Sequence, residues 1–81
     1  MVRVVIMPPF TNEFFGGKDR LEIEAANLFG AVRELGELGP GFSEVAEVRA
    51  TLAVDGVITA DWSTPLNAAS EVIVLPRVGG G

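Results

Sequence analysis

The chain has 81 residues, of which 48% are hydrophobic and 21% are charged, and its formal net charge is -5 at pH 7. This length suits one small domain, and the composition is that of a globular protein rather than a disordered one. The absence of cysteine and histidine excludes thiolate chemistry, zinc sites built from these residues, and general-base catalysis by histidine. The excess of acidic residues disfavours nucleic-acid binding and favours a basic protein partner.

The first half of the chain predicts two strands followed by a helix. Residues 2–7 are rich in β-branched side chains and predict a strand. Residues 8–19 predict a long connection with its tight turn at Gly16-Gly17, and residues 20–24 alternate as a strand with one wet face. Asn27 is the expected N-cap of a helix. The apolar residues of that helix follow a helical spacing and form one stripe: Leu28, Ala31, Val32, Leu35 and Leu38.

A hairpin is predicted in the second half of the chain. Residues 42–47 are expected to be a connector, and residues 48–54 alternate as a strand. Asp55-Gly56 is a strong signal for a two-residue turn, and residues 57–59 predict the returning arm.

The last strand completes a recognisable order of elements. Residues 60–70 predict a loop with one helical turn near Leu66, and residues 71–75 predict an apolar strand that stops at Pro76. The order strand, strand, helix, hairpin, strand is that of an α+β fold of the β-grasp (ubiquitin-like) type. In this fold a mixed sheet wraps one main helix, and the first and last strands are parallel neighbours. The pattern alone leaves other small α+β arrangements open.

The end of the chain is its most unusual segment. We expect a β-grasp domain over residues 1–76 and a flexible tail over residues 77–81, Arg77-Val78-Gly79-Gly80-Gly81. Because glycine has no side chain, such a tail can carry a carboxylate into a narrow channel, and five extended residues reach roughly 17 Å. The alternative is a disordered tail without a function.

The rest of the sequence contains no comparable chemical signal. The carboxylates lack the spacing of a calcium site or of an acid/base pair and are interpreted as solvated surface, so no metal site is expected. Gly16-Gly17-Lys18 lacks the context of a phosphate-binding loop. The apolar N-terminus is too short and too interrupted, by Arg3 and two prolines, for a membrane span. A basic segment and a small-residue cleavage site are both missing, so no signal peptide is expected. We therefore expect a cytoplasmic protein that binds neither membrane nor nucleic acid.

Residues 71–81, with the sequence EVIVLPRVGGG, resemble the end of the MoaD/ThiS family of ubiquitin-like sulfur carriers. Residues 28–35 are similar to the single helix of that family, Val54-Asp55-Gly56 to its hairpin, and Thr64-Pro65-Leu66 to the element before its last strand. The length suits the small subunit of molybdopterin synthase. The sequence departs from the family at Gly79, which is an extra glycine, and at Arg77, where a proline or a small residue is common.

The resemblance implies a carrier rather than an enzyme. An adenylating, E1-like enzyme would use ATP and magnesium to activate the carboxylate of Gly81, and a sulfur donor would convert the adenylate to a thiocarboxylate. The carrier itself would bind no cofactor. The large subunit of molybdopterin synthase, or another sulfur-accepting enzyme, would then consume the sulfur.

An apolar patch is expected beside the start of the tail, on the outward face of the parallel first and last strands. Its members are Val5, Met7, Ile73 and Leu75. Such a patch on a small domain usually marks an interface with a partner. The alternative is that loops of the same chain cover it, through Phe14 or Phe15.

Other functions stay open at this point. The sulfur could serve cysteine or thiamine biosynthesis instead of molybdopterin. The chain could also be a ubiquitin-like protein modifier, in which activated Gly81 is joined to a lysine. A third possibility is a structural β-grasp module with an inert tail.

Overall fold

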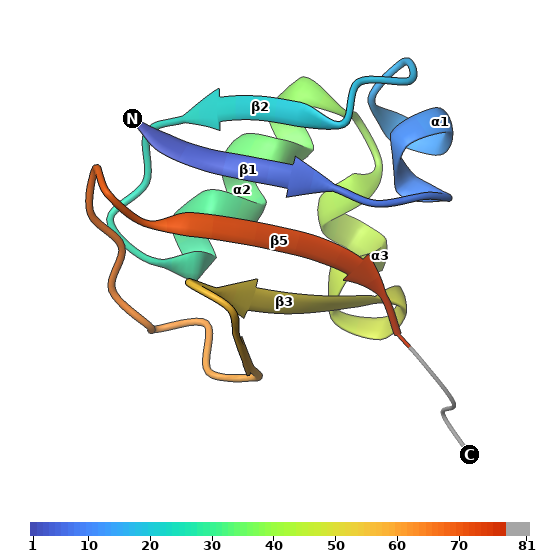
Figure 1. The fold of residues 1–81 in the computed structure, drawn as a ribbon. Helices are drawn as coiled ribbons and strands as arrows, with labels where there is room; N and C mark the ends of the chain where they lie inside the picture. The colour runs from blue at the N-terminus through green and yellow to red at the C-terminus, as the bar shows by residue number, and fades with distance from the viewer. Residues whose placement is uncertain (78–81) are drawn as a thin grey trace.

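The computed structural model describes residues 1–77, which form one sheet and three helices (Figure 1). The strands are β1 (Val2–Ile6), β2 (Arg20–Ile23), β3 (Ala50–Val54), β4 (Val57–Thr59) and β5 (Glu71–Pro76). The helices are α1 (Phe10–Phe14), α2 (Leu28–Leu38) and α3 (Phe42–Arg49). The sheet order is β2-β1-β5-β3-β4, and β1 and β5 are parallel whereas the other neighbours are antiparallel. The predicted pairing of the first and last strands is confirmed.

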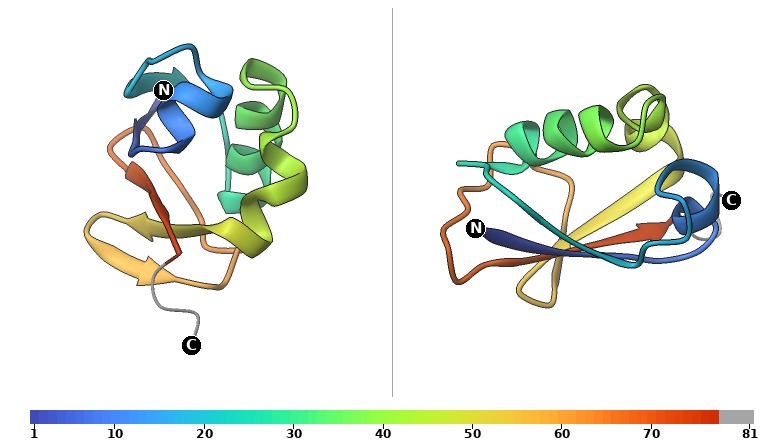
Figure 2. Two further views of the ribbon diagram at one scale, coloured as in Figure 1. Left: turned by 90° about the vertical axis from the view of Figure 1, so that its right-hand side faces the viewer. Right: turned by 90° about the horizontal axis from the view of Figure 1, so that it is seen from above.

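The helices gather on one side of the sheet. Figure 2 shows α2 and α3 across one face and α1 at the end of the sheet where β1 stops. No helix of residues 1–77 covers the opposite face, which we call the open face.

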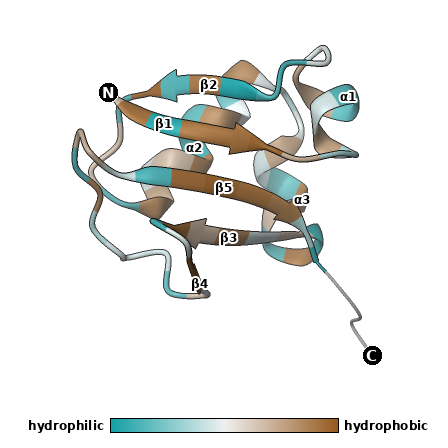
Figure 3. Cartoon of the chain, viewed as in Figure 1, coloured by the Kyte–Doolittle hydropathy of each residue, from teal (hydrophilic) through white to brown (hydrophobic). Residues whose placement is uncertain are grey.

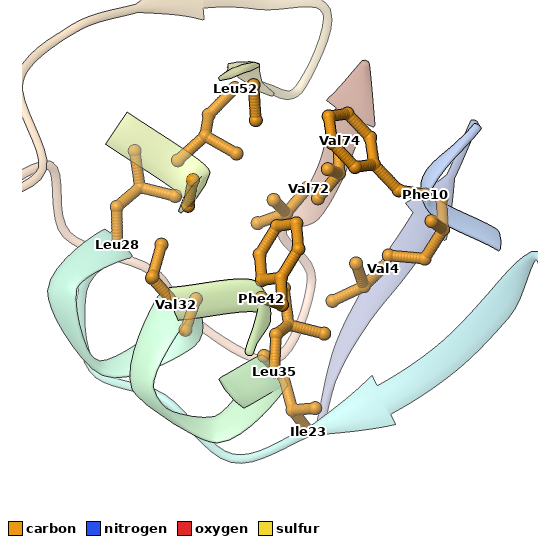
Figure 4. Close-up of a cluster of buried hydrophobic side chains, with 14 of the residues drawn as sticks. Val4, Phe10, Ile23, Leu28, Val32, Leu35, Phe42, Leu52, Val72 and Val74 are labelled. Carbon is orange, nitrogen blue, oxygen red and sulfur yellow. The ribbon is translucent and has the colours of Figure 1, made fainter. Parts of the chain in front are cut away.

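The hydrophobic core fills the space between the sheet and the helices (Figure 4). Alternate residues of the two central strands are buried there, and the stripe of α2 packs against them. The sheet contributes Val2, Val4, Ile6, Val72 and Val74, and α2 contributes Leu28, Ala31, Val32 and Leu35. Because strand side chains alternate, the neighbours of these valines point to the open face.

The predicted helix is confirmed over Leu28–Leu38. Its N-cap is Asn27, whose side-chain oxygen accepts a hydrogen bond from the Gly30 N–H at 2.9 Å. The prediction was wrong for Leu38, which is 53% exposed. At 100° per residue this side chain points about 70° away from the centre of the buried stripe.

Two further helices lie where connections were expected. Helix α1 lies within residues 8–19, and α3 replaces the expected connector and the start of the next strand, so that Val48 is helical and 69% exposed. Neither helix begins with a side-chain cap, and α3 buries only Phe42 and Ala46. Both helices are stabilised by an aromatic cluster, in which Phe10 lies 5.7 Å and Phe14 5.8 Å from the Phe42 ring. Contacts far apart in the sequence therefore decide these helices.

The turns follow the expected chemistry, with one exception. Asp55 and Gly56 have φ values of 49° and 84°, which are the positive angles that a type I′ hairpin turn requires. The predicted helical turn near Leu66 is wrong. Leu66 is instead buried in an extended segment, and its N–H donates to the Ala26 carbonyl at 2.9 Å.

Candidate functional site

Strand β5 leads the chain to the predicted attachment site. It lies between β1 and β3 in the centre of the sheet and ends at Pro76, which is opposite Ala50 of β3. Gly81, the predicted site of adenylation, lies outside the described residues, as do the tail residues Val78, Gly79 and Gly80. Arg77 is the last described residue, and it directly follows Pro76 at the end of β5.

Arg77 is hydrogen-bonded to the end of α3. Its main-chain N–H donates to the Arg49 carbonyl at 2.8 Å. Its guanidinium Nη1 donates to the carbonyls of Glu47 at 3.2 Å and Val48 at 3.5 Å. A cation beside the last carbonyls of a helix is favourable because these groups carry partial negative charge.

The predicted partner-binding residues lie together on the open face. Val5 is directly opposite Ile73, and the Met7 N–H donates to the Val74 carbonyl at 2.9 Å, which places Met7 at the end of the same strand pair. Met7 is 44% exposed, and Val5, Ile73 and Leu75 are half-buried. We call these four residues the open-face patch, and Figure 3 shows the continuous apolar sequence of β5 that contributes to it.

The aromatic residues proposed as a cover for this patch lie elsewhere. The rings of Phe14 and Phe15 lie 5.8 Å and 5.4 Å from the ring of Phe42, in the cluster beside the core. The alternative that Phe14 or Phe15 covers the patch is therefore wrong.

The register extends the apolar surface beyond the predicted residues. Ile73 is opposite Ala53 of β3, and Ala53 is opposite Ile58 of the edge strand β4. Ile58 is 66% exposed, whereas Ala53 is buried between its neighbours. The sequence missed these two positions because the order of the strands, and not their pattern, brings them into the same row as Val5.

Charged side chains lie along one end of this face. Arg3 of β1 is opposite both Glu22 of β2 and Glu71 of β5, and Arg20 is opposite Val5. Together with Val5 they line a depression of about 340 Å³. Both signs of charge alternate here, so the depression has no strong preference for an anion or a cation.

A groove of about 730 Å³ lies beside β4, between this strand, the start of α2 and the end of α3, and Ile58 is part of its lining. Phe29 is 60% exposed at its wall and forms an edge-to-face contact with Trp62, with 5.8 Å between the ring centres. Val48 and Arg77 also line it. Sequence reasoning missed this groove, although an aromatic residue at position 29, next to the buried stripe of α2, was a signal for it.

The titratable groups with shifted pKa values have structural roles. The hydrogen bond from Arg49 lowers the pKa of Glu13, and hydrogen bonds from the hydroxyl and the backbone N–H of Ser63 lower the pKa of Asp61. Both carboxyls are therefore ionised at neutral pH. Within residues 1–77 no group of three or more potential metal ligands is present, and no helix is long and apolar enough to cross a membrane.

Known proteins match this chain by structure but not by sequence. No family model matches the sequence, and no curated protein matches it significantly. Solved structures do match. CysO of Mycobacterium tuberculosis is 18% identical with a TM-score of 0.84, and the match covers 96% of this chain and 100% of CysO.

Two other solved structures match the chain, a modifier protein and a subunit of a molybdopterin-converting factor complex. Small archaeal modifier protein 1 of Methanosarcina acetivorans is 15% identical with a TM-score of 0.81, and the match covers 99% of this chain and 95% of the modifier. A chain from the complex of subunits 1 and 2 of the molybdopterin-converting factor of Helicobacter pylori 26695 is 24% identical with a TM-score of 0.69. That match covers 99% of this chain and 97% of the other. The structural likeness thus extends over nearly the whole chain, and the chain has the predicted β-grasp, ubiquitin-like fold.

Proposed function

We propose that this chain is a sulfur carrier whose residue Gly81 is adenylated and then converted to a thiocarboxylate. The observation that supports the proposal is the position of β5. This strand is held between β1 and β3, and the glycine-rich segment follows it after only Arg77 and Val78. A strand in the middle of the sheet that is followed within two residues by Gly79-Gly80-Gly81 suits a domain that presents a glycine carboxylate to an enzyme.

The proposed chemistry needs no side-chain nucleophile from this chain. A carboxylate oxygen of Gly81 attacks the α-phosphorus of ATP, pyrophosphate leaves, and an acyl adenylate forms. Hydrosulfide from a donor then attacks the acyl carbon, AMP leaves, and loss of the proton gives the thiocarboxylate. An E1-like partner supplies the ATP and magnesium sites, which agrees with a chain that has neither cysteine nor histidine.

The open-face patch is the proposed contact with this partner. It combines half-buried apolar side chains with a charged border, an arrangement common at protein interfaces. The net charge of -5 favours a partner with a basic surface around the contact.

Molybdopterin biosynthesis is the proposed destination of the sulfur. The structural match to a chain of a molybdopterin-converting factor complex, 24% identical, supports this assignment. The match to CysO, at a TM-score of 0.84, keeps a carrier for cysteine biosynthesis as an alternative, beside thiamine biosynthesis.

The intact mass of the protein tests the proposal. The chain is incubated with ATP, magnesium, sulfide and an adenylating enzyme from the same cell, and a chain lacking Gly81 is the control. We expect a mass gain equal to the exchange of one oxygen for sulfur, absent from the control. No gain with an enzyme that is active on another carrier would refute the carrier function.

A protein modifier is the second candidate, because small archaeal modifier protein 1 shares the fold at a TM-score of 0.81. This function predicts lysine-linked conjugates in cell extracts that disappear when Gly81 is deleted. If pathway activity survives deletion of Gly80 and Gly81 in a folded protein, both candidates fail and a structural module with an inert tail remains.

A further inference from the structure

We propose that Arg77 is a positioning residue that fixes the start of the C-terminal segment against the end of α3. The contact itself is read from the structure. Its consequence for activation of Gly81 rests on the proposed carrier function.

The end of β5 and the end of α3 meet at one corner of the fold because β3 follows α3 directly. Ala50 is the first residue of β3 and also the C-cap of α3, and it is opposite Pro76 in the sheet. The next residue, Arg77, therefore lies beside the last turn of the helix, as its hydrogen bonds to the carbonyls of Glu47, Val48 and Arg49 show.

Arg77 supplies the hydrogen-bond donors that this last turn lacks. The final four carbonyls of a helix have no intrahelical partner unless the chain continues or a cap donates to them. Ala50 N–H donates to the Ala46 carbonyl. The remaining three carbonyls, of Glu47, Val48 and Arg49, all accept hydrogen bonds from Arg77, two from its guanidinium and one from its main-chain N–H.

This arrangement fixes where the tail begins. With Arg77 attached to the helix, residue 77 is already in place before a partner enzyme binds. Without the guanidinium, the partner has to order residue 77 on binding, which weakens binding but leaves the reacting carboxylate unchanged. The expected signature is a higher KM with an unchanged kcat.

Steady-state adenylation kinetics of Arg77→Ala test this consequence. Release of pyrophosphate is measured against carrier concentration with the same adenylating enzyme. We expect KM to rise about three- to tenfold and kcat to stay within about twofold, because the exposed hydrogen bonds of a charged group have modest strength. Arg77→Lys keeps a cation that can donate to these carbonyls and should recover part of the loss. Arg33→Ala removes an exposed arginine from α2 and should leave both constants unchanged.

Amide hydrogen exchange in the free protein tests the contact without any enzyme. The amides of residue 77 and Ala50 should exchange about tenfold faster in Arg77→Ala than in the wild type, because the last turn of α3 opens more often. Unchanged exchange overturns the proposal. If KM rises but amide exchange is unchanged, the positioning role is also overturned, and Arg77 instead contacts the partner directly. If the wild-type chain is never adenylated, the carrier function fails, and the exchange rates still decide whether Arg77 holds the helix end.

Discussion

Gly39 ends α2 at a point where a side chain has no room. A Cβ atom placed there would lie 2.6 Å from the Phe14 carbonyl oxygen and 2.7 Å from Cε1 of Phe15. The Gly39 N–H also donates to the Leu35 carbonyl at 2.8 Å, so the backbone cannot move away freely. Glycine is thus required here for space, because its φ of -128° is open to any residue.

This close contact predicts that Gly39→Ala destabilises the fold by about 1–3 kcal/mol, through overpacking against a backbone atom. Denaturant unfolding of both proteins measures the difference. The matched control is Gly30→Ala in the same helix, where the nearest atom to an added Cβ would be Oδ1 of Asn27 at 3.5 Å. Because alanine favours helix, this control should be more stable than the wild type by up to about 1 kcal/mol. Equal unfolding midpoints for the two variants would contradict the packing described for Gly39.

At the scale of elements, α1 depends on its neighbours. Five residues are too few for a helix to be stable by itself, and α1 has no side-chain cap. Apart from its phenylalanines, it is attached to α3 by two hydrogen bonds between the Arg49 guanidinium and the Glu13 carboxylate, each 2.8 Å long. The same guanidinium lies 5.4 Å from the centre of the Phe10 ring. This single arginine therefore joins an ion pair to an aromatic contact.

The ion pair predicts a pH-dependent contribution to stability. The hydrogen bond from Arg49 lowers the folded-state pKa of Glu13 below the usual 4.5, so ionisation of Glu13 favours folding. The contribution is present above the unfolded pKa and is lost as the pH falls through the lowered folded pKa. Glu13→Gln should therefore melt below the wild type at pH 7, and the difference should disappear in strong acid.

Thermal melts across this range measure the effect, with Glu37→Gln on the exposed side of α2 as the control. Both partners of the Glu13–Arg49 pair are about 40% exposed, 41% for Glu13 and 40% for Arg49, so the shift in Tm should be small and should decrease with added salt. A difference that persists unchanged in strong acid would show that the carboxylate charge does not stabilise α1.

In the whole molecule, the helices of residues 1–77 lie on one side of the sheet, and none of them covers the open-face patch. The patch lies on β1 and β5, and β5 is the strand that continues into the tail. A partner that receives Gly81 can therefore contact the same strand pair. Leu75 is closest in sequence to the tail and is half-buried.

If the open-face patch is the proposed contact with an adenylating partner, Leu75→Arg should keep the fold and weaken that binding by about tenfold or more, because it places a charge in an apolar contact. Leu38→Arg introduces the same change at an exposed leucine on α2 and should bind like the wild type. Calorimetry measures the affinities, and circular dichroism confirms that both variants are folded. Equal affinity of the two variants would exclude Leu75 from the interface.

Local chemistry was enough to predict much of this molecule. The 3.6-residue period and the Asn27 cap predict α2, and Asp55-Gly56 predicts the hairpin, because each depends on residues close together in the chain. The order of the predicted strands favours the β-grasp topology but leaves other small α+β arrangements open, and the structure shows that β1 and β5 are the parallel neighbours. The predicted patch residues share one face because alternation along a strand is also a local property.

The sequence by itself thus determined the main helix, the hairpin and the approximate positions of the strands. Only the tertiary structure decided the rest. Helices α1 and α3 form because Phe10, Phe14 and Phe42 meet across more than 25 residues of sequence. The contact of Arg77 with the end of α3 likewise joins positions 28 to 30 residues apart, and no local pattern can signal a donor that satisfies carbonyls at such a distance.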